Sequence, residues 1–176
     1  MRREIHSAWL SVAMLAGAIV LGGCGPKDFT AATMVMDLAV PEGFGWTGRP
    51  VTIDDPESLA ENLGQDGHDL LERNWVSTTL GQMDSPQSVI KIAVHGLGSD
   101  DDAAGALTEN KYPGAEAIGV GQEGYRWLDR GADETIFFRR GSYFAQLTID
   151  RVEDGVALEP VAARLDALLG RRSSPF

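Results

Sequence analysis

The sequence predicts a single α+β domain with a largely antiparallel sheet and helices packed on one face, preceded by a helical signal peptide. Segments with capped helical starts alternate with segments whose hydrophobicity has a period of two, and the strand-like segments are joined by hairpin-length turns. No internal repeat or dividing linker occurs in the 176 residues, which predicts one domain.

The first part of the domain predicts an interrupted helix. Residues 29–40 are apolar without a clear period and fit a strand or a helix, whereas 41–50 form a loop rich in glycine and proline. A helix begins at 54–57 (DDPE), where a capping carboxylate precedes a proline and a glutamate in the first turn. Gly64 and Gly67 interrupt its leucine stripe and predict a kink or a close contact with another element.

The middle of the domain predicts two strands and a short helix. Residues 76–80 and 89–95 alternate, and in the second segment the isoleucines and Val94 share a face opposite His95. The aspartates that follow Ser99 begin a helix, which a Tyr-Pro-Gly sequence ends.

The last part of the domain predicts a hairpin and a terminal helix. Residues 115–120 form a strand, and 135–139 and 143–150 flank a turn. The inward row of the second hairpin strand is Tyr143, Ala145, Leu147 and Ile149. A helix with a proline in its first turn follows over 159–170, where Gly170 ends it.

The composition restricts the partners. The formal net charge of −11 repels nucleic acid and anionic lipid headgroups, so neither is an expected partner. Cationic ligands, basic proteins, divalent metals or simply the solubility of an exported domain remain as explanations of the charge. Cys24 is the single cysteine, so an intrachain disulfide is excluded.

The N-terminus predicts an export signal. Arg2 and Arg3 precede the uncharged segment 8–21, which would span about 21 Å as a helix, less than the roughly 30 Å hydrocarbon core of a bilayer. A basic start, a short apolar middle and a small-residue end are typical of a cleaved signal rather than a spanning helix.

Residues 21–24 (LGGC) resemble the lipobox of bacterial lipoprotein signal peptides, although Gly22 is less usual than Ala or Ser. The resemblance implies removal of 1–23 and attachment of diacylglycerol and a further acyl chain, such as palmitate, to Cys24. It also implies a place on the cell membrane or outer membrane, facing the periplasm or the exterior. The alternative is a chance cysteine beside an ordinary cleavage site. The predicted organisation is a signal peptide (1–23), a lipidated N-terminus and tether (24–37), the α+β domain (38–170) and a loose tail (171–176).

A second resemblance covers about residues 38–150. The order of LAENLGQDGHDLLERNW, PGAEAIGVGQEGYRW and FFRRGSYFAQLTI is similar to that in a family of uncharacterised domains of bacterial secreted proteins and lipoproteins. Gly67 matches its mid-helix glycine, and Arg140, Gly141 and Tyr143 match its basic-Gly-x-Tyr turn. The resemblance implies an exported α+β domain and no particular activity.

The motifs assign no catalytic residue, cofactor or metal. Residues 119–124 (GVGQEG) match G-x-G-x-x-G, but no helical pattern follows, which favours a tight turn over a dinucleotide site. His68 and His95 lack zinc-ligand spacing and are expected to be ordinary surface or packing residues. The adjacent aspartates 100–102 lack the alternate spacing of a calcium loop.

Two aromatic residues are candidates for a partner site. If one sheet face is open to solvent, Phe137 and Phe144 form an exposed apolar patch. The alternative is burial of both sheet faces, and we favour it.

The expected function is therefore non-catalytic. The first hypothesis is a lipid-anchored envelope domain that binds or senses a small ligand. The second is an envelope structural or assembly component that contacts another protein through Phe137 and Phe144. An enzyme is the third, because the sequence contains no recognisable catalytic constellation.

Overall fold

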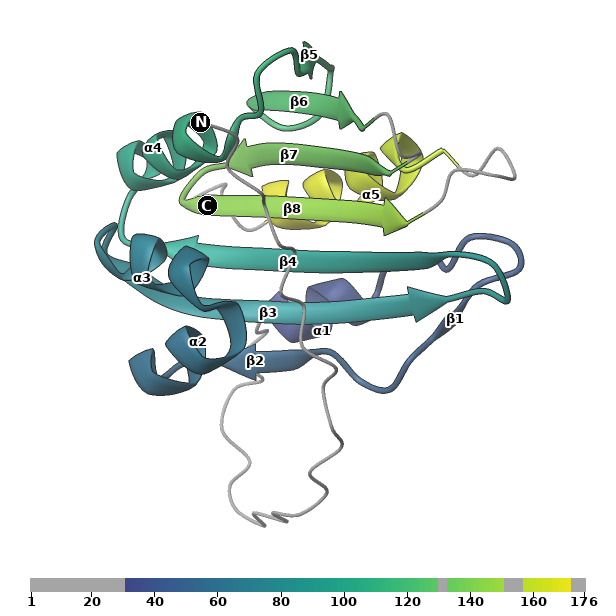
Figure 1. Cartoon of the computed structure of the whole chain (residues 1–176), viewed down its shortest axis with the longest axis horizontal. Coiled ribbons are helices and arrows are strands. Elements are labelled where there is room, and N and C mark those ends of the chain that lie inside the picture. Colours follow the sequence, from purple (N-terminus) through teal and green to yellow (C-terminus); the bar gives the residue numbers. More distant parts are fainter. Residues whose placement is uncertain (1–30, 130–132, 151–156, 172–176) are drawn as a thin grey trace, which may run out of the picture.

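The computed structural model describes residues 31–129, 133–150 and 157–171 (Figure 1). The signal peptide and Cys24 lie outside these residues. The helices are α1 (Ala31–Met36), α2 (Pro56–Leu63), α3 (Gln65–Leu71), α4 (Asp100–Asn110) and α5 (Glu159–Gly170). The strands are β1 (Gly45–Trp46), β2 (Val51–Ile53), β3 (Trp75–Asp84), β4 (Val89–Leu97), β5 (Glu116–Ala117), β6 (Glu123–Leu128), β7 (Glu134–Arg140) and β8 (Tyr143–Asp150).

The described strands form one antiparallel sheet in the order β1-β3-β4-β8-β7-β6-β5, and β2 also pairs with β3. Strand β8 is inserted between β4 and β7, so Ala145 lies opposite both Val94 and Phe138. The predicted fold class is confirmed: the protein is an α+β domain with an antiparallel sheet. The predicted hairpin is present as β7 and β8, and its inward row packs in the core.

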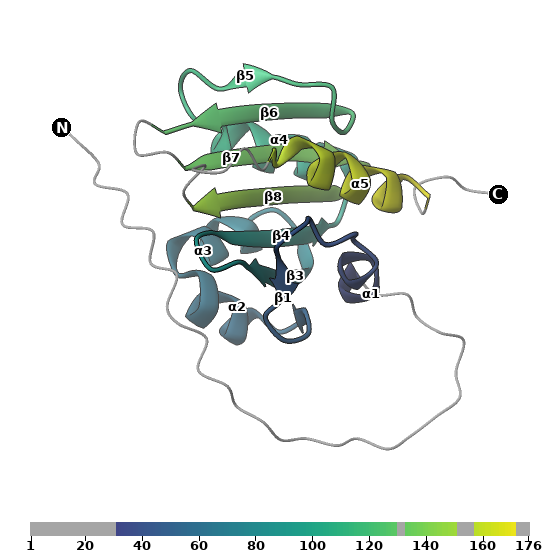
Figure 2. The same ribbon diagram turned by 90° about the vertical axis from the view of Figure 1, so that its right-hand side faces the viewer.

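The prediction that the helices pack on one face is wrong, because they cover both faces. Figure 2 places α1 and α5 on one side of the sheet and α2 and α3 on the other. Helix α4 packs with α2 and α3 in the second of two separate core clusters. The reason lies in the central strands: Phe137 and Phe138 are adjacent and point to opposite faces, yet both are buried, so each face needs a cover.

The domain also begins earlier than predicted. Segment 29–40 fits either a strand or a helix by sequence, and its described part contains helix α1. Met34, Val35 and Leu38 are buried in the cluster that α5 shares. Residues 31–37, which were predicted to be part of a tether over 24–37, therefore pack as part of the domain.

Gly64 separates α2 from α3, and Gly67 lies within α3 in close contact with α2, so the predicted interruption of the helix is present. Gly64 has a φ of +59°, which favours glycine and ends α2. A Cβ atom at Gly67 would lie 2.7 Å from the carbonyl oxygen of Leu59, so the two short helices are in close backbone contact.

Candidate functional site

A small cleft opens where α3 and α4 meet the sheet. We call it the α3–α4 cleft; its volume is about 30 Å³. Its apolar lining is Leu63, Leu70, Ala93, Ala106 and Phe144. Its polar and charged lining is Asp66, Asp69, Arg73, His95, Glu109, Asn110 and Gln146. A cavity of this size accommodates one or two water-sized groups.

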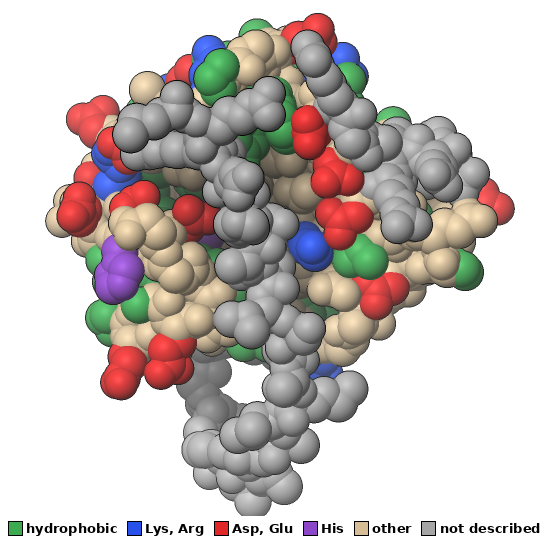
Figure 3. Space-filling view, in the orientation of Figure 1, with side chains coloured by type: hydrophobic (Ala, Val, Ile, Leu, Met, Phe, Trp, Pro, Cys, Tyr) green, Lys and Arg blue, Asp and Glu red, His purple; other side chains and the backbone are tan. Residues whose placement is uncertain are grey.

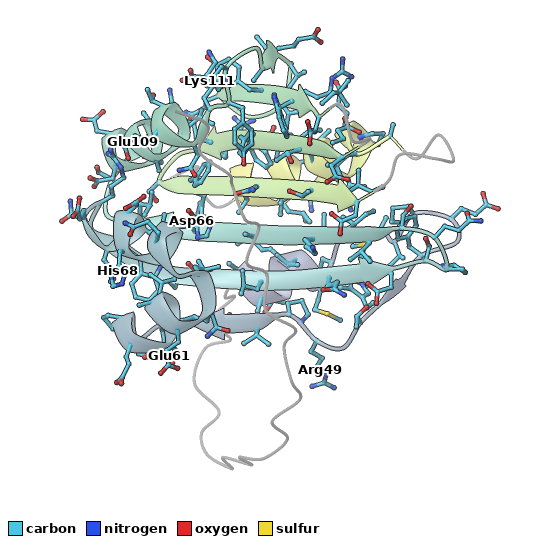
Figure 4. All side chains as sticks on the ribbon, in the orientation of Figure 1. Arg49, Glu61, Asp66, His68, Glu109 and Lys111 are labelled. Atoms are coloured by element: carbon cyan, nitrogen blue, oxygen red, sulfur yellow. The ribbon has the colours of Figure 1, made fainter. Side chains whose placement is uncertain are left out.

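The two helices hold the charged rim. Asp66 and Asp69 lie one turn apart on α3, and Glu109 lies near the end of α4, as Figure 4 shows for Asp66 and Glu109. Arg73, just after α3, donates from Nε to Glu109 Oε2 at 2.8 Å and from Nη2 to Oε1. This ion pair joins the end of α3 to α4.

His95 on β4 forms the floor of the cleft. It is 4% exposed, stacks on Phe144 with ring centroids 5.5 Å apart, and has its Nδ1 2.9 Å from Thr78 Oγ1. Thr78 in turn accepts a hydrogen bond from Trp75 Nε1 at 2.8 Å. Burial lowers the pKa of His95 to about 4, so the imidazole is neutral at pH 7.

The carboxylates at the rim are close enough to affect each other. Burial, and then the negative charge of Asp69, raises the pKa of Asp66. Asp69 itself accepts a hydrogen bond from Gln65 Nε2 at 2.7 Å. Figure 3 shows further acidic side chains spread over this face of the molecule. The rim is therefore an anionic surface above a neutral imidazole.

Aromatic residues extend the same face beyond α4. The Tyr112 ring lies 4.4 Å from Trp127 and contacts Phe137 edge-on at 5.2 Å. Burial, and then the charge of Asp66, raises the pKa of the Tyr112 hydroxyl. Lys111 Nζ lies 3.7 Å from the centre of the Tyr125 ring, so a cation–π contact already occupies that ring.

The predicted exposed patch is not formed. Phe137 and Phe144 are 1% and 2% exposed, because the helices on this face cover them. The sheet face is not open to solvent at these positions. Burial of both sheet faces, which the sequence analysis favoured, is what the structure shows. Phe144 reaches the cleft only as a wall residue.

The other motifs have structural roles in the described residues. Gly121 in GVGQEG has a φ of +76° and precedes strand β6, so this segment is a tight turn. Ser99 caps α4 by accepting a hydrogen bond from the backbone N–H of Asp102 at 3.1 Å. His68 is exposed on α3 and points away from the cleft lining (Figure 4).

Sequence reasoning did not find the cleft. It placed His95 on the polar side of β4, and nothing in the sequence brought that side together with Asp66 or Glu109. One signal was present: Ala93 precedes His95 on the same face, and a small apolar neighbour is unusual on an exposed strand face. No group of three or more metal-ligating side chains is gathered in the described ranges.

Comparisons with known proteins give little similarity. No family model matches the chain, and no curated protein matches it. Among solved structures, the extracellular domain of PknH from Mycobacterium tuberculosis is similar with a TM-score of 0.49 and 8% sequence identity. The similarity covers 80% of this chain and 90% of that one. Neither a shared family nor a shared role follows from similarity at this level. No helix in the described part has the length and apolar character that a membrane crossing requires.

Proposed function

We propose that the protein is a lipid-anchored, extracytoplasmic domain that binds a ligand in the α3–α4 cleft and does not transform it chemically. The observation that carries the proposal is the sequence of the N-terminus. Arg2 and Arg3, the uncharged segment 8–21, two glycines and Cys24 occur in the order and spacing of a lipoprotein signal.

Lipid attachment would be sufficient to hold the protein at a membrane. Two acyl chains of about 15 methylenes each, at about 0.8 kcal/mol per methylene, give an upper limit of about 24 kcal/mol. Helix α1 begins at Ala31, so residues 25–30 alone separate Cys24 from the first described helix. A segment of that length reaches at most about 20 Å, which would keep the domain next to the bilayer.

Binding rather than catalysis is supported by the groups that line the cleft. Among the described residues, its lining includes no serine, threonine, cysteine or lysine side chain that would act as a nucleophile. The hydroxyl paired with His95 belongs to Thr78, which is 0% exposed and also accepts a hydrogen bond from Trp75. A substrate in the cleft would therefore not reach that hydroxyl.

The anchor is tested by labelling with an alkyne fatty acid in a bacterial host. The wild-type chain should incorporate label and sediment with membranes, whereas Cys24→Ala should do neither, because it lacks the thiol that accepts the lipid. Gly22→Ala is the matched control, since alanine is also small at that position and should preserve labelling. Label that persists in Cys24→Ala, or that never enters the wild type, would contradict the anchor.

A further inference from the structure

We infer that the α3–α4 cleft binds a primary ammonium group on an aliphatic chain, with the Asp66 carboxylate as counterion and the His95 ring at the floor. The inference rests on the proposed binding function, because it assigns a ligand class to the same cleft.

Among the described residues, Asp66 is the cleft carboxylate that has no hydrogen-bond or ion-pair partner. Asp69 accepts a hydrogen bond from Gln65, and Glu109 is paired with Arg73. No group among the described residues hydrogen bonds to the Asp66 carboxylate or forms an ion pair with it. Desolvation by neighbouring atoms, and then the like charge of Asp69, disfavour its ionised form, although the residue is exposed at the rim. A cation beside Asp66 would relieve both effects.

The floor of the cleft gives a second, independent observation. His95 is almost completely buried, and its only hydrogen bond within the described ranges is the one between Nδ1 and Thr78 Oγ1. In the described part of the chain, Arg126 Nε is the one enclosed side-chain N or O atom without a partner. His95 Nε2 also has no partner but is not fully enclosed. Because His95 lines the cleft, this nitrogen is reached from there. Such a nitrogen indicates a polar group or water at that place.

The charge of the cleft selects a cation. His95 is neutral at pH 7 and adds no positive charge, while an anion would be repelled by Asp66 and Asp69. Thr78 Oγ1 has two lone pairs and is able to accept from Trp75 Nε1 and His95 Nδ1 at once. The Thr78–His95 contact fits either imidazole tautomer. In the tautomer protonated at Nδ1, the Nε2 lone pair is available to an ammonium N–H donor, so an ammonium ligand would select that tautomer.

The size and lining of the cleft favour an ammonium head with an aliphatic stem. An ammonium group is similar in size to water and fits a cavity of about 30 Å³. Leu63, Leu70 and Ala106 supply apolar wall on which methylenes would pack. A divalent metal fits less well, since no cluster of three or more His, Cys, Asp or Glu ligands occurs in the described part.

Two sources carry this chemistry: a free diamine and the lysine side chain of a peptide. The experiment uses cadaverine for the first and Nα-acetyl-lysine amide for the second. The neutral analogues 1-pentanol and Nα-acetyl-norleucine amide have similar stems without the charge. The full chain in nonionic micelles is titrated with each compound, and amide and imidazole ¹⁵N shifts are recorded.

Cadaverine or the lysine amide should shift signals of α3, α4, β4 and β8 with a Kd in the millimolar range, whereas the neutral analogues should not. Binding by cadaverine alone would identify a diamine source, and binding by both would include lysine side chains. In the amine complex, the His95 Nε2 signal should be that of an unprotonated nitrogen accepting a hydrogen bond. Each amine should be recovered unchanged.

Variants locate the site. Asp66→Asn should weaken binding roughly tenfold, since it removes the counterion. His95→Asn keeps an amide near the position of Nδ1, removes Nε2, and should weaken binding several-fold. Glu61→Gln on α2, away from the cleft lining, is the matched control for general attraction to an acidic surface and should leave binding unchanged (Figure 4).

The inference is overturned if neither amine shifts these signals at about 10 mM, if amines and alcohols act alike, or if Glu61→Gln weakens binding as much as Asp66→Asn. The titration is repeated on the full-length Cys24→Ala chain. Amine binding by this variant does not require the lipid. If lipid labelling fails but the amine binds, only the anchor is contradicted, and if labelling succeeds but the amine does not bind, only the ligand assignment is contradicted.

Discussion

On the α1–α5 face, the buried polar side chains Thr79 and Glu134 lie beside the larger apolar cluster, and Thr79 hydrogen bonds to Thr52. The α2–α3–α4 face buries His95 and Thr78 beside its smaller apolar cluster. The first arrangement is that of an ordinary hydrophobic core. The second retains a buried imidazole with an unpartnered nitrogen, which does not favour stability. This difference is the basis of our proposal that the first face mainly stabilises the fold and that the second binds a ligand.

The largest expected effect is on the α1–α5 face. Leu165 is 0% exposed on α5, so Leu165→Ala should lower the free energy of unfolding by about 2–5 kcal/mol through lost burial and a residual cavity. Urea denaturation measures this change. Amine binding by the fraction that remains folded should be unaltered, and a parallel loss of affinity would show that the two faces are not independent.

The second effect concerns His95 and the pH dependence of stability. The folded pKa is about 4, below the ordinary value of 6.5, so the unfolded chain binds a proton first as the pH falls. The contribution of neutral His95 to the free energy of unfolding is fully present above pH 6.5. It is lost as the pH falls from 6.5 to 4, and the loss amounts to roughly 3 kcal/mol.

His95→Asn cannot titrate in this range and should lack this loss. Urea denaturation of both proteins at several pH values measures the difference, because the carboxylates common to both cancel. Parallel curves for wild type and variant would contradict a buried neutral imidazole on this face.

The smallest effect distinguishes two ion pairs. Arg140 donates from Nε and Nη2 to the two carboxylate oxygens of Asp166, both at 2.5 Å, and the Asp166 side chain is 14% exposed. Asp166→Asn should cost about 1–3 kcal/mol, because it leaves Arg140 without its anion. Glu109→Gln breaks the more exposed pair with Arg73 and should cost about 0–1 kcal/mol. Thermal denaturation compares them, and equal losses would mean that the cleft pair also supports the fold.

Local signals in the sequence predicted many of the elements correctly. Asp55 caps α2 by accepting a hydrogen bond from Ser58 N at 2.8 Å, and the glycine break, the hairpin and the bounds of α5 lie where the sequence places them. These features depend on residues a few positions apart, so they are visible in a linear sequence. The segment 115–120 is less regular than expected, since strand pairing is limited to β5.

Short-range patterns in the sequence were enough to predict the fold class, the helix starts and turns, and an anchor at Cys24. Three features became known from the folded structure: helices cover both faces of the sheet, Phe137 and Phe144 are buried, and Asp66 and Glu109 border a cleft above His95. These facts depend on which distant segments pack together, and alternating hydrophobicity does not specify that when both faces of a strand are buried.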